Sequence, residues 1–217
     1  MNRREFSLQV AGIAGAAALG SLVPGLAFAS PTAPVEGTDY DRLKTPLTLP
    51  KTGKFEVIEF FWYGCPHCNA FEPTIEPWIA KLPADVNFHR VHVQFNARQE
   101  IHQRIYYTWE TLGLLGQMHA KTFARFHVER KPIDSEDDML AFARENGLDV
   151  AKVKATWNSF AMTSKIRQAQ QQCDDYRVDG VPMIGIHGRY TTAPSKNGGA
   201  ECLQTTDALV ALLRKTA

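Results

Sequence analysis

An apolar stretch that runs directly into two closely spaced cysteines constrains the fold of this 217-residue chain more than any other feature. Residues 54–63, "KFEVIEFFWY", are rich in β-branched and aromatic side chains, with Glu59 as the exception in the middle of the run. This composition is typical of a strand in a sheet that helices cover on both faces. Cys65 and Cys68 follow in "GCPHC", so we expect the pair at the point where this strand ends.

The segment after the cysteines predicts a helix and then a second strand. In "NAFEPTIEPWIAKL" the apolar residues that fall on one helical face are Phe71, Ile75, Trp78, Ile79 and Leu82. Pro73 and Pro77 lie inside this pattern, and we expect them to kink or break the helix. Residues 86–95, "VNFHRVHVQF", have the pattern of a strand. Strand, helix and strand in this order predict two parallel strands joined by a right-handed crossover, and therefore an α/β fold.

The rest of the chain divides into segments of different character. Residues 30–53 are rich in Pro and Thr, and we expect an extended lead-in that pairs as an edge strand. Residues 54–96 hold the βαβ unit, and residues 97–172 show helical patterns that predict an inserted helical domain of three to five helices. In residues 173–217, "VPMIGI" and "RYTT" predict a hairpin around His187-Gly188, and an amphipathic helix closes the chain.

Residues 1–29 have the three parts of a secretory signal peptide. "MNRREF" is basic, a long uncharged apolar run follows, and "AFA" before Ser30 has the small residues of a cleavage site. We therefore predict an exported protein whose mature chain starts near Ser30, with an uncleaved membrane anchor as the alternative. Either the general secretion (Sec) route or the twin-arginine (Tat) route fits the two arginines.

The charge balance indicates no polyanionic partner. Lys and Arg total 24 against 23 Asp and Glu, and the mature form carries 22 of each after Arg3, Arg4 and Glu5 are removed. Neither nucleic acid nor an anionic membrane surface is therefore expected as the main partner.

Three kinds of site contain two cysteines at this spacing. A zinc site requires two further ligands, and the remaining cysteines, Cys173 and Cys202, do not form a second pair of this kind. A purely structural disulfide between Cys65 and Cys68 would close a very small ring, which removes little entropy from the unfolded chain. A redox couple that opens and closes is the interpretation we favour, and no metal is expected.

The expected position at a helix start supports this interpretation. Unpaired backbone N–H groups and the positive end of the helix dipole face Cys65 there and stabilise its thiolate, which is the form that reacts with disulfides. A stabilised thiolate also stabilises the dithiol relative to the disulfide, and so makes the couple an oxidant. Cys68, one turn further on and more enclosed, is expected to be the resolving thiol.

The chain as a whole resembles the DsbA family of the thioredoxin superfamily. The resemblance rests on the signal peptide, the strand, "CPHC" and helix in succession, the helical insertion, and the "GVP" that opens a late strand. The resemblance covers the chain from about Phe55 to its end. It implies a thioredoxin fold with an inserted helical domain, a periplasmic location and the activity of a dithiol oxidase.

The resemblance also implies roles for single residues. By position, Cys65 is the nucleophile, Cys68 the resolving cysteine, Pro66 and His67 the dipeptide that tunes the couple, and Pro182 a cis-proline beside it. Val181 is expected to present its backbone to a substrate strand. Three charged residues match positions near the family's active site: Glu59, Glu72 and Arg90. Glu59 has two open interpretations, a structural ion pair with Arg90 or assistance to proton movement at Cys68.

The expected function is the introduction of disulfide bonds into exported, incompletely folded proteins. Re-oxidation by a membrane quinone reductase of the DsbB kind follows from the resemblance alone, and the enzyme is expected to act as a monomer without a cofactor. A disulfide reductase or isomerase is the enzymatic alternative, and a redox-silent peptide-binding chaperone is the alternative from another class.

Cys173 and Cys202 are expected to form a second, structural disulfide. They are equally far from the turn at His187-Gly188, so an extrapolated hairpin ladder would bring them opposite each other. An oxidising compartment permits such a bond, which in the chain-entropy model would stabilise the fold by about 3–4 kcal/mol.

Overall fold

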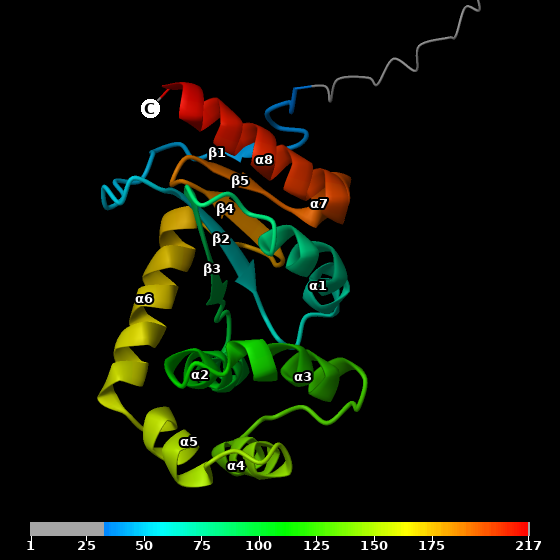
Figure 1. Ribbon diagram of the computed structural model, residues 1–217, viewed down its shortest axis with the longest axis vertical. Coiled ribbons are helices and arrows are strands. Elements are labelled where there is room, and N and C mark those ends of the chain that lie inside the picture. The colour runs from blue at the N-terminus through cyan, green and yellow to red at the C-terminus, as the bar shows by residue number, and fades with distance from the viewer. Residues whose placement is uncertain (1–32, 217) are drawn as a thin grey trace, which may run out of the picture. The chain divides into compact units, whose positions relative to one another are not determined.

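A mixed sheet of five strands lies at the centre of the computed structural model, which describes residues 33–216 (Figure 1). The expected signal peptide, residues 1–29, lies outside the described residues. The strand order is β1-β5-β4-β2-β3. The strands are β1 (Asp41–Arg42), β2 (Phe55–Phe61), β3 (Val86–His92), β4 (Met183–Ile186) and β5 (Tyr190–Thr192).

The pairing of the strands confirms the βαβ unit, the hairpin and the edge strand. Strand β2 pairs in parallel with β3, with Glu59 opposite Arg90, and antiparallel with β4 on its other side. Strands β4 and β5 form the expected hairpin, whose turn residues His187 and Gly188 both have positive φ angles. Strand β1 pairs antiparallel with β5, so the lead-in does supply an edge strand.

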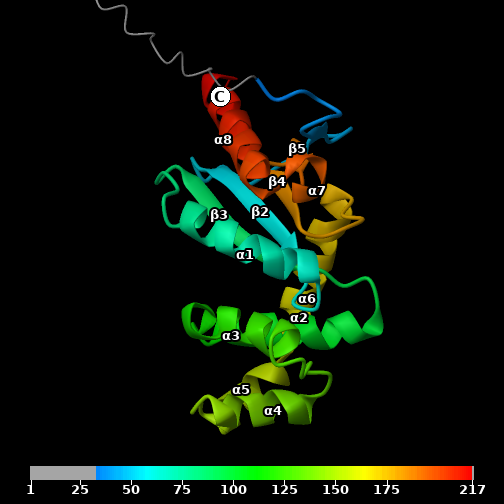
Figure 2. The ribbon, with the colours of Figure 1, turned by 90° about the vertical axis from the view of Figure 1, so that its right-hand side faces the viewer.

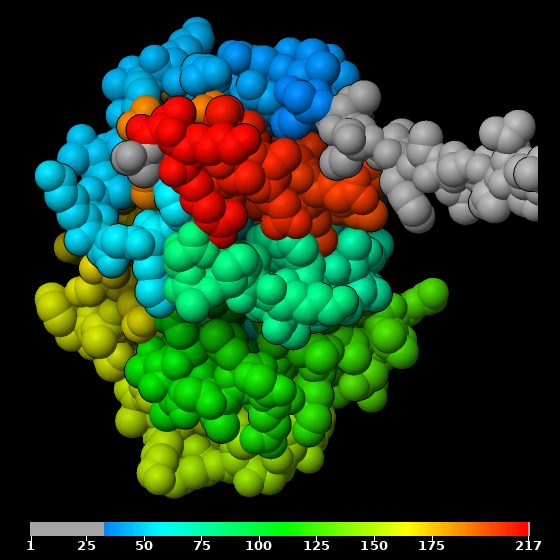
Figure 3. Space-filling model, turned by 45° about the horizontal axis from the view of Figure 1, so that its top comes forward, coloured from blue at the N-terminus to red at the C-terminus, as the bar shows by residue number. Residues whose placement is uncertain are grey.

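Helices α1 (Pro66–Ile79) and α8 (Gly199–Thr216) pack on one face of the sheet. Leu209 of α8 and Ile75 of α1 lie in one buried cluster with Val57 of β2. Figure 3 shows the surface of α1 between the red surface of α8 and the green surface of the helices that follow β3. Helix α1 therefore contacts both the sheet and the helical insertion.

Helix α1 continues through both of its internal prolines, so of the two expected effects, a kink or a break, the break does not occur. Pro73 and Pro77 lie inside the helix that the structure forms from Pro66–Ile79. Each proline lacks one backbone N–H, but Phe71 and Ile75 are buried on the opposite side of the same turns. Packing of this apolar face, rather than intrinsic propensity, supplies most of a helix's stability in a folded protein.

Five helices stand between β3 and β4, within the expected number of three to five. They are α2 (Ala97–Thr111), α3 (Leu115–His127), α4 (Glu136–Glu145), α5 (Val150–Trp157) and α6 (Phe160–Tyr176). The last of them runs four residues past residue 172, where the insertion was expected to end. A short helix, α7 (Pro194–Asn197), precedes α8. Among the described residues, no helix is both long enough and apolar enough to cross a membrane.

The expected disulfide between Cys173 and Cys202 is wrong. Cys173 lies in α6, in the buried cluster that includes Tyr176 and Phe60, whereas Cys202 lies in α8, in the cluster on the other face of the sheet. Both are free, buried thiols. The hairpin ladder cannot be extrapolated to them because helices replace the strands: β5 ends at Thr192.

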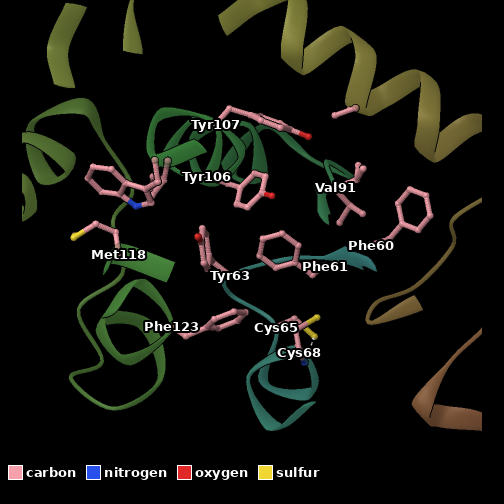
Figure 4. Close-up of a cluster of buried hydrophobic side chains, with 14 of the residues drawn as sticks. Phe60, Phe61, Tyr63, Cys65, Cys68, Val91, Tyr106, Tyr107, Met118 and Phe123 are labelled. Carbon is pink, nitrogen blue, oxygen red and sulfur yellow. Dashed lines mark hydrogen bonds between the residues drawn. The ribbon is translucent and has the colours of Figure 1, made fainter. Parts of the chain in front are cut away.

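An aromatic cluster fixes the end of β2, from which the cysteine segment extends (Figure 4). The ring of Phe61 makes edge-to-face contacts with Tyr63 and with Tyr106 of α2, each with centroids 5.2 Å apart. Phe123 of α3 contacts the Tyr63 ring at 5.0 Å. The helical insertion therefore packs directly against the chain that leads to Cys65.

Candidate active site

Cys65 caps the amino end of α1, where the backbone supplies N–H groups to its sulfur. Its Sγ accepts a hydrogen bond from the backbone N–H of Cys68 at 3.4 Å. Pro66 lies in the first turn, where its missing N–H costs no helical hydrogen bond. The backbone N–H of Cys65 donates to the carbonyl of Trp62 at 2.9 Å, which closes the loop between β2 and α1. The two sulfurs lie side by side, and both are free thiols in this structure (Figure 4).

These contacts distinguish the two sulfurs chemically. The pKa of Cys65 is lowered from 9.0 to about 6, first by a hydrogen bond from the Cys68 thiol. Backbone N–H groups of Cys68 and His67 and the nearby His67 ring also lower it, against the cost of burial. Burial, together with the hydrogen bond to Cys65 and the charge of its sulfur, raises the pKa of Cys68 far above its ordinary value. Cys65 is thus a thiolate at neutral pH while Cys68 keeps its proton.

The loop before β4 lies against the Cys65 sulfur. Because β2 and β4 are antiparallel, with Phe60 opposite Met183, the end of β2 lies beside the start of β4. The Val181–Pro182 peptide bond is cis, as the resemblance implied. The Cys65 sulfur lies 3.5 Å from the carbonyl oxygen of Val181, to which it donates when it is protonated. The topology therefore brings together two segments that are more than a hundred residues apart in the sequence.

A cavity of about 850 Å³ opens beside this contact. Its lining includes His67 and Phe71 of α1 and the loop residues Val181 and Pro182. His67 is exposed, so its ring faces the solvent side of the cavity rather than the core. The cavity is large enough for side chains of a second polypeptide to approach the cysteines.

A group of charged side chains joins β2, β3 and α1 around Arg90. Arg90 of β3 donates to Glu59 of β2 at 2.7 Å, to Glu76 of α1 at 2.9 Å and to Glu72 of α1 at 3.5 Å. The ion pair between Glu59 and Arg90, one of the two open interpretations, is therefore present. Sequence reasoning had not included Glu76, although it stands one helical turn after Glu72.

Burial raises the pKa values of two of these carboxyl groups, Glu59 and Glu72. Glu59 is completely buried, and desolvation raises its pKa to about 6 against the opposing effect of Arg90. Desolvation likewise raises the pKa of Glu72 to about 7. The charge of Glu59 is in turn one of the influences that raise the pKa of Cys68. Glu59 is thus electrostatically linked to the buried sulfur, so the ion pair does not exclude a role in proton movement.

Histidines of the insertion contact helix α1 and the loop before Cys65, although the sequence analysis did not single them out. His119 of α3 has its Nδ1 2.9 Å from the Tyr63 hydroxyl and its Nε2 3.4 Å from a Glu72 oxygen. His102 of α2 accepts a hydrogen bond from the Trp62 indole at 2.7 Å. Only the packing of the insertion against the cysteine loop brings these groups together, so no sequence spacing indicates them.

Comparisons with known proteins agree with this geometry. A family model described as a DSBA-like thioredoxin domain matches residues 56–204. A thiol:disulfide interchange protein DsbA of Pseudomonas aeruginosa is 38% identical over 175 residues, which cover 80% of this chain and 83% of that protein. The protein of the same name from Bordetella pertussis is 35% identical over 202 residues, covering 92% of this chain and 95% of the relative.

Solved structures give the same result. The crystal structure of Pseudomonas aeruginosa DsbA superposes with a TM-score of 0.80 at 37% identity, covering 83% of this chain and 94% of that one. The oxidoreductase DsbA of Xylella fastidiosa superposes with a TM-score of 0.78 at 28% identity, covering 84% of this chain and 98% of that one.

Proposed function

The chain belongs to the family of DSBA-like thioredoxin domains and is a thiol:disulfide oxidoreductase, a dithiol oxidase of the DsbA kind, and from this premise we propose that Cys65 is the sulfur that exchanges with substrate. In this proposal Cys68 is the resolving thiol. The observation that carries it is the contrast between the two sulfurs: the pKa of Cys65 is lowered to about 6, whereas Cys68 is fully buried with a raised pKa.

The reaction transfers two electrons from a substrate dithiol to the enzyme. A substrate thiolate attacks Cys65 of the oxidised pair, the Cys65–Cys68 bond breaks, and Cys68 leaves and takes up a proton. The second substrate thiolate then attacks the substrate sulfur of the mixed disulfide. The substrate disulfide forms, and Cys65 is released as its thiolate.

The stabilised thiolate favours this direction. A thiol whose pKa falls from 9.0 to about 6 is held more firmly in the reduced state by up to about 1.4 kcal/mol at neutral pH, or about 30 mV for two electrons. Solvent at the edge of the sulfur reduces this figure. The backbone N–H groups of α1 and His67 together make the couple more oxidising than an unperturbed dithiol.

The surrounding residues have supporting roles in this proposal. Val181 presents its backbone to an extended substrate segment, and Pro182 holds the loop against Cys65. Pro66 and His67 tune the couple from within the ring that the disulfide closes.

In this proposal the charged residues around Arg90 take part in moving the proton that Cys68 gains and loses. Glu59, with its pKa near 6, accepts or supplies that proton. Arg90 and Glu72 adjust the charge of Glu59.

We infer the substrates and the location from the chain's family. The substrates are exported, incompletely folded proteins with reduced cysteines, which reach the enzyme in the periplasm after cleavage of residues 1–29. Re-oxidation falls to a membrane quinone reductase of the DsbB kind, and the enzyme acts as a monomer without a cofactor. The names of the relatives reported above, which are thiol:disulfide interchange proteins, support this proposal.

Trapping of the mixed disulfide tests the assignment of the sulfurs. Cys68→Ser and Cys65→Ser variants are mixed with a peptide that carries one activated cysteine, and covalent adducts are measured by mass. We expect a stable adduct with Cys68→Ser at neutral pH and much slower reaction with Cys65→Ser. Adducts that form only on Cys65→Ser would reverse the roles of the two sulfurs.

A further inference from the structure

Three potential metal ligands meet at the junction of α1 and α3. Glu72 and Glu76 stand one turn apart on α1, and His119 comes from α3, which lies alongside α1 (Figure 2). One ligand atom from each of these residues lies within 4.8 Å of the other two. The same side chains line a cavity of about 600 Å³, so the group is reachable from solvent.

The buried ring of His119 directs its Nε2 toward the carboxylate of Glu72. The residue is 6% exposed, and its Nε2 has no hydrogen-bond partner among the described residues. Its other nitrogen, Nδ1, lies 2.9 Å from the Tyr63 hydroxyl. In the tautomer in which Nδ1–H donates to that hydroxyl, the lone pair of Nε2 faces the carboxylates. A hydrogen bond from Nδ1 is the usual means of orienting a histidine that binds a metal through Nε2.

The charges around the group are unbalanced. Three carboxyl groups, those of Glu59, Glu72 and Glu76, share the single guanidinium of Arg90. When all three are ionised the cluster carries a net charge of −2. A bound divalent cation would neutralise it, and buried charges are tolerated in proteins when they are paired or coordinate a metal.

We propose that Glu72, Glu76 and His119 form a binding site for a divalent transition-metal ion. Two ligands on a tetrahedral zinc ion, each about 2.0–2.1 Å from the metal, are about 3.4 Å apart. The distance between Glu72 Oε2 and His119 Nε2 is 3.4 Å, so this pair fits without movement. The side chain of Glu76 is 53% exposed and is free to turn toward the ion.

The ligand set favours zinc and its neighbours over hard cations. An imidazole nitrogen with two carboxylate oxygens suits Zn²⁺, Cu²⁺ or Ni²⁺, whereas Mg²⁺ and Ca²⁺ prefer oxygen ligands alone. The sequence analysis expected no metal because Cys65 and Cys68 lack two further ligands at a suitable spacing. The site proposed here combines residues of two separate helices and uses neither Cys65 nor Cys68, although it shares Glu72 with the charged group around Arg90.

Zinc titration of the full protein tests the proposal. The Cys65–Cys68 pair is first oxidised, so that the catalytic sulfurs cannot bind the probe. Zn²⁺ alone is then titrated into the wild type and into Glu76→Gln, His119→Gln and Glu201→Gln by isothermal calorimetry. Glu201 is the matched control, since it is an exposed helical carboxylate that forms no ion pair within the described part of the chain.

We expect one saturable zinc site per chain in the wild type and in Glu201→Gln. Loss of one ligand in Glu76→Gln should weaken binding by about tenfold or more, and His119→Gln should weaken it further. Zinc should also raise the unfolding temperature of the wild type and the control more than that of Glu76→Gln at the same zinc concentration. The proposal is overturned if the wild type shows no saturable site, or if Glu76→Gln binds zinc as tightly as the control. Glu76→Gln decides the matter even if His119→Gln does not fold, because Glu76 lies at the surface.

Discussion

The lowered pKa of Cys65 makes the stability of the reduced protein depend on pH in a defined direction. A thiol whose pKa is lower in the folded than in the unfolded chain contributes stability that is fully present above the unfolded pKa. This contribution is lost as the pH falls through the folded pKa, which is about 6 for Cys65. The informative perturbation is Cys65→Ser, because serine keeps the shape and the hydrogen-bond acceptor but does not ionise.

The expected magnitude follows from the two pKa values, 9.0 and about 6. As the pH rises from about 5 to about 8, the ionisation of Cys65 adds about 2.6 kcal/mol to the free energy of unfolding of the reduced wild type. Cys65→Ser lacks this increase. Solvent screening at the sulfur lowers this figure, and we expect about 1–2.5 kcal/mol. Glu59 and Glu72 have raised pKa values and act in the opposite direction, but they are present in both proteins and cancel in the difference.

Urea unfolding under reducing conditions measures this difference. Free energies of unfolding are determined for both proteins across the pH range by circular dichroism, with the oxidised wild type as a control that has no free Cys65 thiol. The difference between reduced wild type and Cys65→Ser should grow as the pH rises. A difference that stays constant, or that shrinks with rising pH, would refute the assignment of a stabilised thiolate to Cys65.

Three further outcomes follow from single contacts. His67→Pro removes both a backbone N–H and a ring beside Cys65, so the pKa of the Cys65 thiol, followed by the ultraviolet absorbance of the thiolate, should rise. The couple should become less oxidising by about 30 mV for each pKa unit. An unchanged titration midpoint would contradict this. Phe61→Ala should lower the free energy of unfolding by about 3–5 kcal/mol in urea, because the ring is fully buried in the aromatic cluster; a loss below about 1 kcal/mol would contradict the packing described. Oxidised protein that is denatured without reductant should show two reactive thiols per chain, those of Cys173 and Cys202. If no reactive thiol were found, Cys173 and Cys202 would be bonded to each other, against the structure.

The local sequence pattern was sufficient to predict the sheet and the central residues of the site. The apolar run before Cys65, the spacing to Cys68 and the turn at His187-Gly188 each specify a short segment, and a βαβ unit has one common handedness. Sequence also suggested that Glu59 could pair with Arg90, because a lone acid in a buried strand needs a partner.

Long-range packing accounts for what the pattern did not reveal. His119 reaches Glu72 only because α3 packs against α1, and neither helix carries a signal of that contact. Cys173 and Cys202 were equidistant from a turn, but equal distance along the chain has structural meaning only while the strands continue. Pro77 likewise looked unfavourable for a helix, although Ile75 already belonged to an apolar helical face in the sequence; how much the packing of that face stabilises the helix depends on the rest of the fold.

The redox potential of the Cys65–Cys68 couple tests the central claim most directly. The protein is equilibrated with buffers of reduced and oxidised glutathione, and the reduced fraction is determined by trapping its thiols. An oxidant with a stabilised Cys65 thiolate should have a potential more positive than about −180 mV, the value typical of protein disulfide isomerase. A potential near about −270 mV, typical of thioredoxin, would contradict the account and make the protein a reductase.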